Sequence, residues 1–161
     1  MVVYVDTSVI ISAIDKGDQR CKDSDKFLRR VKEKIISPLV LAEIYSVVSR
    51  NSERINLGLN VAEADLPAVI ARLCMRKYDL KLVCVFDKDF SIFGEIPTEF
   101  KLAFMLAPKL KLRTLDLLHI SYAWAIKLNG YNVEEFVTLD GGILDRAKDI
   151  EKITDIRVIE P

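Results

Sequence analysis

Short apolar runs alternate along the chain with segments in which apolar residues recur at helical spacing. Five runs are predicted as strands, and they cover residues 2–5, 35–36, 82–86, 136–139 and 156–159. The helical segments between them cover residues 24–34, 39–50, 61–78, 98–106 and 114–130. Strands that alternate with helices over the whole length predict an α/β fold, with a mainly parallel central sheet flanked by helices.

Two of the predicted strands, residues 2–5 and 82–86, have no polar face, which is typical of strands buried on both faces in a parallel sheet. Ser37 and Pro38 are predicted as the N-cap and first residue of the helix that follows them. Residues 87–111 have the least clear pattern. Neither a repeat nor a Gly/Ser-rich linker interrupts the chain, so residues 1–161 are predicted to form a single domain.

The charge of the chain is balanced, with 24 Lys and Arg against 24 Asp and Glu. A chain of 161 residues that is 50% hydrophobic can bury a full core, which excludes disorder as its dominant state. The zero net charge excludes a generally basic nucleic-acid binder, because no global positive field attracts the polyanion. Affinity for a nucleic acid must therefore come from a local basic patch or from bound cations.

The cysteines and the N-terminus indicate the compartment. Three cysteines at wide spacing, without a CxxC pair, exclude a disulfide framework and a zinc ribbon. The N-terminus has no basic region before its first apolar run, and no apolar run approaches the roughly 20 residues that span a bilayer. We therefore expect a cytoplasmic protein without a membrane partner.

Four carboxylates stand out by position. Asp6 and Asp140 each follow a predicted strand, and ligands in parallel sheets bind beyond the carboxyl ends of the strands. Glu43 projects from a mostly apolar helical stripe, where an unpaired charge is costly. Asp116 lies in the first turn of the helix that begins at Thr114.

Each of these carboxylates also has a purely structural interpretation. Asp6 and Asp140 are suited to helix caps or turns. Asp116 would complement the helix dipole, and Glu43 would pair with a buried arginine. Together they indicate more, because four carboxylates at one end of a sheet repel each other unless divalent cations compensate their charge. Oxygen ligands favour Mg²⁺ or Mn²⁺ over Zn²⁺.

Four segments resemble those of a known family: residues 5–10 (VDTSVI), 39–44 (LVLAEI), 112–123 (LRTLDLLHISYA) and 136–140 (FVTLD). In this order they resemble the four successive motifs of the PIN-domain nucleases, and the chain is similar in size to the VapC-type toxin ribonucleases among them. The resemblance implies a Rossmann-like PIN domain and metal-dependent hydrolysis of RNA. It matches the acidic quartet of the family, both catalytic and metal-binding, to Asp6, Glu43, Asp116 and Asp140. It matches the hydroxyl positions beside the quartet to Thr7 or Ser8 and to Thr138.

This match makes chemical sense. One or two Mg²⁺ or Mn²⁺ ions held by Asp6, Asp116 and Asp140, with Glu43 bound directly or through water, would lower the pKa of a bound water and neutralise the attacked phosphate. His119 lies one turn after Asp116. It is expected either to orient that carboxylate or to pack as a core side chain.

Other residues near the quartet have two interpretations each. Asp145, on the short helix after the last acid, is either a fifth carboxylate or a surface residue. Lys109, Lys111 and Arg113 precede the helix that carries the third acid, where they either contact RNA phosphates or form a solvated loop. The resemblance also implies partners, namely an RNA substrate, a small antitoxin that places a basic side chain among the carboxylates, and a second copy in a homodimer.

Other protein classes compete with a toxin nuclease. A phosphoacceptor receiver domain would use Asp87, but it also needs an acid pair after the first strand and a lysine after the last. A haloacid-dehalogenase-like phosphatase needs an acid at the position of Ser8. A PIN-type nuclease of RNA processing, or a catalytically silent PIN-like domain that binds RNA or protein, is the remaining alternative.

Overall fold

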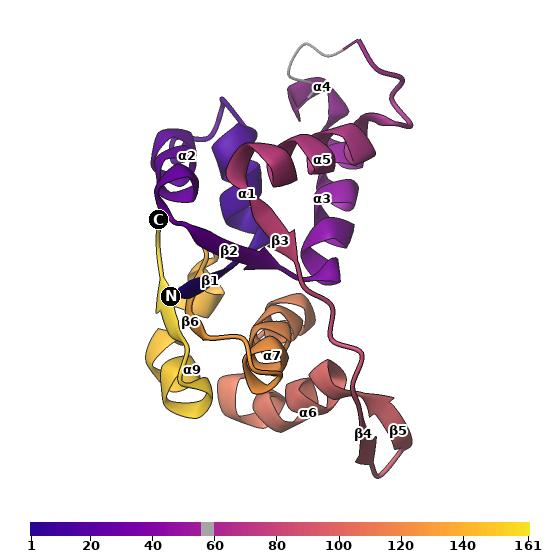
Figure 1. The fold of residues 1–161 in the computed structure, drawn as a ribbon, viewed down its shortest axis with the longest axis vertical. Coiled ribbons are helices and arrows are strands. Elements are labelled where there is room, and N and C mark those ends of the chain that lie inside the picture. The colour runs from indigo at the N-terminus through magenta and orange to yellow at the C-terminus, as the bar shows by residue number, and fades with distance from the viewer. Residues whose placement is uncertain (56–59) are drawn as a thin grey trace.

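The computed structural model describes residues 1–55 and 60–161, and its centre is a five-stranded sheet (Figure 1). In spatial order the strands are β3 (Leu80–Leu82), β2 (Glu33–Ile36), β1 (Val2–Val5), β6 (Val133–Val137) and β7 (Arg157–Ile159). All neighbouring strands of this sheet are parallel. The predicted α/β class and the mainly parallel sheet are therefore confirmed.

Helices cover both faces of the sheet (Figure 1). On one side lie α1 (Thr7–Ile14), α2 (Cys21–Arg30), α3 (Pro38–Arg50) and α5 (Leu66–Tyr78). On the other side lie α6 (Thr98–Leu110), α7 (Thr114–Leu128) and α9 (Ala147–Thr154). Two short helices are α4 (Ser52–Ile55) and α8 (Gly141–Leu144). Within the described ranges, no helix is both long enough and apolar enough to cross a membrane.

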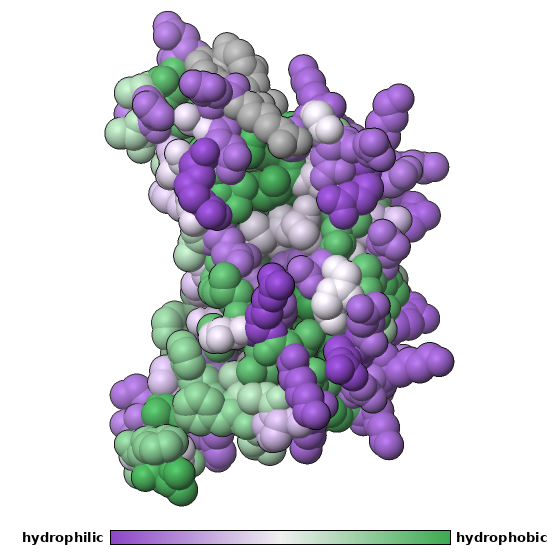
Figure 2. All heavy atoms as spheres, turned by 180° about the vertical axis from the view of Figure 1, so that it is seen from behind, coloured by the Kyte–Doolittle hydropathy of each residue, from purple (hydrophilic) through white to green (hydrophobic). Residues whose placement is uncertain are grey.

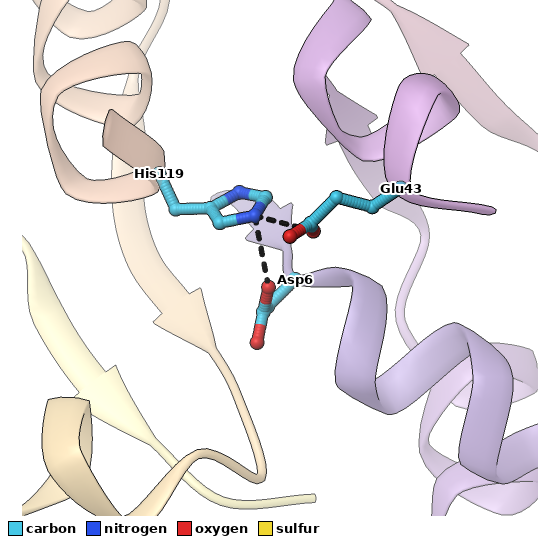
Figure 3. A group of neighbouring side chains, drawn as sticks. All are labelled: Asp6, Glu43 and His119. Atoms are coloured by element: carbon cyan, nitrogen blue, oxygen red, sulfur yellow. Dashed lines mark hydrogen bonds and ion pairs between the residues drawn. The ribbon is translucent and has the colours of Figure 1, made fainter. Parts of the chain in front are cut away.

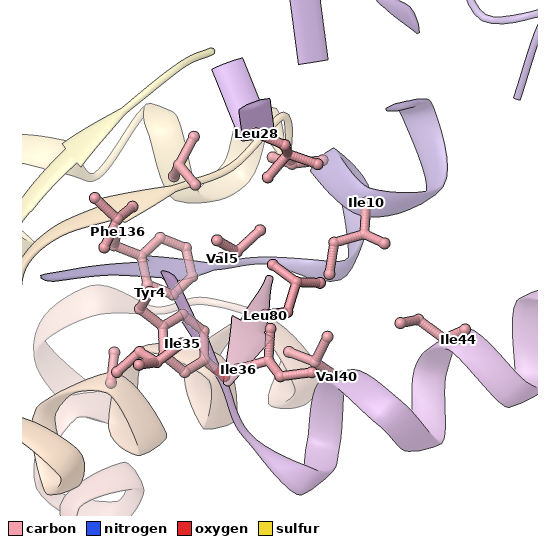
Figure 4. Packing of buried hydrophobic residues seen from close by; sticks show 14 of the residues in the cluster. Tyr4, Val5, Ile10, Leu28, Ile35, Ile36, Val40, Ile44, Leu80 and Phe136 are labelled. Atoms are coloured by element: carbon pink, nitrogen blue, oxygen red, sulfur yellow. The ribbon is translucent and has the colours of Figure 1, made fainter. Parts of the chain in front are cut away.

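The core surrounds the central strand β1 (Figure 4). Val3, Tyr4 and Val5 have no exposed surface, as expected for a strand that is apolar on both faces. The ring of Tyr4 stacks on Phe136 of β6, with the ring centroids 5.1 Å apart, and the two residues are also partners in the strand register. This packing fixes the end of β1, and with it the position of Asp6, the next residue.

The strand predicted at residues 82–86 is wrong. β3 covers Leu80–Leu82, because its partner β2 ends at Ile36, which pairs with Leu82. Beyond this pair Val83 is buried, but Phe86 is 86% exposed. The chain then forms a hairpin of β4 (Lys88–Ser91) and β5 (Gly94–Pro97), a separate two-stranded sheet that the sequence did not indicate.

Element boundaries also differ from the predictions. α1 begins directly after Asp6, where the sequence left a loop or a helix start open, and α5 begins at Leu66 rather than at residue 61. β6 ends at Val137 rather than at residue 139, because Val137 pairs with the last residue of β1. Thr138 and Asp140 therefore both lie beyond the carboxyl end of the strand.

Candidate functional site

A pocket of about 330 Å³ opens at the carboxyl edge of the sheet. Four different parts of the chain bring carboxylates to it: Asp6 after β1, Glu43 of α3, Asp116 of α7 and Asp140 after β6. Thr7, Ser8 and His119 also line it. The structure therefore brings together all four acids that the sequence matched to the quartet.

The side chain of Asp6 accepts hydrogen bonds from hydroxyl groups and does not cap a helix. It occupies the N-cap position of α1, yet its side chain accepts no capping hydrogen bond. Instead its Oδ2 atom accepts hydrogen bonds from Ser8 Oγ and Thr138 Oγ1, both at 2.6 Å. The Asp6 side chain is 6% exposed, so these two bonds compensate the loss of water around the oxygen. The capping interpretation of Asp6 is therefore wrong.

Asp140 both caps a helix and lines the pocket. Its Oδ1 accepts a hydrogen bond from the backbone N–H of Ile143 at 3.1 Å and so caps α8. Its own backbone N–H donates to Thr138 Oγ1 at 2.9 Å. Thr138 has no exposed surface and connects Asp6 to the turn that carries Asp140.

Glu43 and His119 lie side by side in the site, with the imidazole facing the carboxylate (Figure 3). His119 Nε2 lies 2.6 Å from Glu43 Oε2 and 3.6 Å from Asp6 Oδ1, and Thr7 Oγ1 donates to the same Glu43 oxygen at 2.5 Å. The buried partner of Glu43 is thus a histidine, where the sequence left an arginine open. His119 is 2% exposed, and its Nε2 atom lies within ion-pair distance of Glu43 and Asp6, which lie on other segments of the chain.

The pKa values of two acids in the site, Asp116 and Glu43, shift in opposite directions. Burial, and then the charges of Asp140 and Asp6, raise the pKa of Asp116 above its ordinary 3.8. Burial also acts to raise the pKa of Glu43, but the hydrogen bonds from His119 and Thr7 outweigh it and lower that pKa. Asp140 and Asp6 thus both repel a negative charge on Asp116.

The donor set fits a divalent cation. Asp6, Glu43 and His119 each offer a ligand atom, and these atoms lie within 4.8 Å of one another. Carboxylate oxygens suit Mg²⁺ and Mn²⁺, and an imidazole nitrogen is also acceptable to Mn²⁺. A bound cation would in addition compensate the repulsion that raises the pKa of Asp116.

The remaining predicted residues lie further out. Asp145 is exposed and does not line the pocket, as in its surface interpretation. Lys109 and Lys111 are exposed at the end of α6 and do not line the pocket either. Arg113 lies near Asp116. Burial raises the pKa of Asp116, and the positive charge of Arg113 acts to lower it.

Sequence reasoning missed Arg20, which lines the same pocket. It lies in the loop before α2, and Asp18 holds its guanidinium through Nε at 3.1 Å and Nη2 at 3.0 Å. This pair lowers the pKa of Asp18 to about 2. Only the charge of Arg20 could have signalled it, because hydrophobic periodicity does not place a loop relative to a sheet edge.

Comparisons with known proteins identify the family and agree with the fold. The PIN domain family model matches residues 3–149. VapBC2 from Rickettsia felis, bound to a promoter DNA fragment, is 17% identical, with a TM-score of 0.59, and the match covers 100% of this chain and 99% of that one. VapC20 from Mycobacterium tuberculosis, a Sarcin-Ricin loop cleaving toxin, is 14% identical, with a TM-score of 0.57 and coverage of 96% and 98%. DNA-bound VapBC from Salmonella typhimurium is 14% identical, with a TM-score of 0.56 and coverage of 99% and 98%. No curated protein matches the chain.

Proposed function

Since this chain belongs to the PIN domain family, we propose that it is a metal-dependent endoribonuclease that hydrolyses RNA phosphodiester bonds as the toxin of a toxin-antitoxin pair. The observation that carries the proposal is the convergence of Asp6, Glu43, Asp116 and Asp140 on one pocket at the carboxyl edge of the sheet. Open parallel sheets bind their ligands at this edge.

The four acids would hold Mg²⁺ or Mn²⁺. When bound, the ion lowers the pKa of a coordinated water and neutralises charge on the attacked phosphate. Ser8 and Thr138 fix one oxygen of Asp6 by hydrogen bonds, which limits rotation of the carboxylate. Thr7 and His119 fix one oxygen of Glu43 in the same way. These hydroxyls and the imidazole therefore orient the carboxylates of Asp6 and Glu43 before a cation binds.

RNA phosphates would meet positive charge at the rim of the pocket. Arg20 lines the pocket, and Arg113 is close enough to act on Asp116. Guanidinium groups bind phosphate oxygens by paired hydrogen bonds. The phosphate contacts predicted for Lys109 and Lys111 stay predictions, and their exposure leaves both side chains free to reach along an RNA strand.

The toxin role rests on the solved relatives, several of which are VapBC structures. We propose a small antitoxin that covers the pocket and places a basic side chain among its carboxylates, because unpaired negative charge attracts such a group. The homodimer, the cytoplasmic location and a single PIN-like domain over residues 1–161 are part of the same proposal. A nuclease role in RNA processing is the second candidate, because the convergence of the four acids on one pocket supports phosphodiester hydrolysis in either setting.

The test is cleavage of a mixed RNA pool by purified protein with Mg²⁺, with Mn²⁺ or with EDTA. Asp116→Asn removes an acid of the pocket, and Asp145→Asn makes the same change at an exposed aspartate outside it. We expect cleavage with either metal, none with EDTA, loss in Asp116→Asn and full activity in Asp145→Asn. Equal cleavage by the two variants, or cleavage in EDTA, would contradict the proposal. Metal binding without cleavage of any RNA would favour a silent binding domain.

A further inference from the structure

Ser37 stands at a helix end without capping it. It occupies the N-cap position of α3, where serine is among the preferred residues, yet its side chain makes no capping hydrogen bond. Its Oγ lies instead 2.7 Å from the hydroxyl of Tyr4, and neither residue has exposed surface. The serine predicted as a cap therefore serves a different contact, inside the protein.

Tyr4 points from the central strand toward the site. Successive side chains of a strand alternate between its two faces, so Tyr4 shares a face with Asp6, two residues later. Its hydroxyl lies 3.3 Å from Nδ1 of His119, and its ring contacts the imidazole edge to face at 6.4 Å between centroids. The stack on Phe136 holds the ring of Tyr4 in place.

The other nitrogen of His119 completes a chain of contacts. Nε2 of His119 lies 2.6 Å from Glu43 Oε2 (Figure 3). The buried groups thus run without interruption from Ser37 through Tyr4 and His119 to Glu43, an acid of the pocket. A histidine ring needs a partner at each nitrogen to keep one orientation, and the groups behind a metal site often set its affinity in this way.

We propose that Tyr4 and Ser37 are positioning residues for the cation site, which hold the ring of His119 so that Nε2 faces Glu43 and orients that carboxylate. The inference rests on the proposed function, because it assumes that Glu43 serves a divalent cation. Phenylalanine at position 4 would keep the stack on Phe136 but leave Nδ1 without its partner. The ring would then be held by hydrogen bonding at Nε2 alone, and the orientation of Glu43 would be less firmly fixed.

The test uses the fact that the chain has one histidine, so its ring signals need no further assignment. ¹⁵N-detected spectra of the metal-free protein report the environment of both ring nitrogens, and Mn²⁺ titration followed by electron paramagnetic resonance reports cation affinity. The variants are Tyr4→Phe and Ser37→Ala. Tyr78→Phe is the control, because it removes a buried tyrosine hydroxyl that bonds Asp25 and the carbonyl of Ala13, outside the pocket.

We expect Tyr4→Phe to shift the Nδ1 signal and to weaken Mn²⁺ binding by about 10-fold, the lower end for a group behind the ligands. Ser37→Ala is expected to act in the same direction but less, and it carries the test if Tyr4→Phe does not fold. Tyr78→Phe should change neither readout. Ring signals or Mn²⁺ affinity that match the control would overturn the inference while leaving the proposed function intact. A wild-type protein that binds no Mn²⁺ would instead refute the proposed function.

Discussion

The pocket at the sheet edge and the β4–β5 hairpin are opposite in character. At the pocket, polar groups are buried, as shown by Thr138 at 0% and Asp6 at 5% exposure. At the hairpin, apolar groups are exposed, as shown by Phe90 at 80% and Ile92 at 93%. Seen from behind, apolar surface gathers at the lower left, where the hairpin and α6 lie (Figure 2).

This difference shows where the chain can do chemistry. A buried polar atom is stable only when it is bonded, so the hydroxyls and acids of the pocket are fixed in one arrangement. The hairpin has its own hydrogen bonds and solvent-accessible ion pairs, Lys88 with Glu95 and Asp89 with Lys101. Such pairs contribute little to stability, and a lone two-stranded sheet is marginally stable. Substitutions are therefore expected to matter at the pocket and to be tolerated at the hairpin.

The largest effect is expected for Asp6→Asn. It removes a charged ligand group and places an amide beside two hydroxyl donors, Ser8 and Thr138. Loss of charge stabilisation worth several kcal/mol lowers the rate of RNA cleavage at least about 100-fold. Asp87→Asn, on the exposed segment before the hairpin, is the matched control and should cleave normally. Similar rates for both variants in a single-turnover assay would contradict the claim that the pocket, and not the hairpin region, carries the chemistry.

Thr138→Val is expected to have the next largest effect. It keeps the shape of the side chain but removes the hydroxyl shared by Asp6 and the backbone N–H of Asp140. The N–H of Asp140 would lose its partner, and Asp6 Oδ2 would keep only the hydrogen bond from Ser8. This should cost about 1–3 kcal/mol in the free energy of unfolding, and cleavage should fall about 10-fold. Ser91→Ala at the hairpin removes hydrogen bonds that water can replace, so denaturant unfolding should barely change.

The metal-free protein is expected to gain stability from Asp116→Asn at neutral pH. Burial, Asp140 and Asp6 raise the pKa of Asp116 above 3.8. A raised pKa gives stability that is present below the unfolded pKa and is lost as the pH rises through the folded pKa. In EDTA the variant should therefore melt above the wild type at pH 7, and the difference should vanish toward acidic pH. Equal melting temperatures at pH 7 would contradict a raised pKa of Asp116 in the folded protein.

The smallest effect is expected for Ile92→Thr at the tip of the hairpin. Because Ile92 is 93% exposed, its replacement should change the free energy of unfolding by less than about 0.5 kcal/mol. RNA cleavage should also stay at the wild-type rate. A loss of cleavage at unchanged stability, measured on the same preparation, would mean that the hairpin contributes to substrate binding.

The sequence predicted the frame of the site well, for a physical reason. Parallel strands share one carboxyl edge, so an acid after β1 and an acid after β6 lie near each other whatever the loops do. Helical spacing correctly placed Glu43 on the inner side of α3, at the pocket. These features follow from short-range periodicity, which a single sequence displays.

What the sequence missed depends on contacts between distant segments. The apolar run at residues 82–86 suggested a strand, but strand length is set by the partner, and β2 ends at Ile36. His119 was expected either to orient Asp116, one turn away on the same helix, or to pack as a core side chain. It is buried, but its ring also reaches across to Glu43 on α3. Ser37 occupies the predicted N-cap position of α3, but its side chain contacts the hydroxyl of Tyr4 instead of capping the helix. Local spacing does not reveal such partners.

Direct measurement of Mn²⁺ binding tests the central claim, that the pocket at the sheet edge holds a divalent cation. Free Mn²⁺ would be counted by electron paramagnetic resonance during titration of the wild type, Asp6→Asn and Asp145→Asn, with Mg²⁺ added as competitor. We expect saturable Mn²⁺ binding in the wild type and in Asp145→Asn, no such binding in Asp6→Asn, and displacement of the bound Mn²⁺ by Mg²⁺. Binding that is absent in the wild type, or unchanged in Asp6→Asn, would contradict a cation site in this pocket.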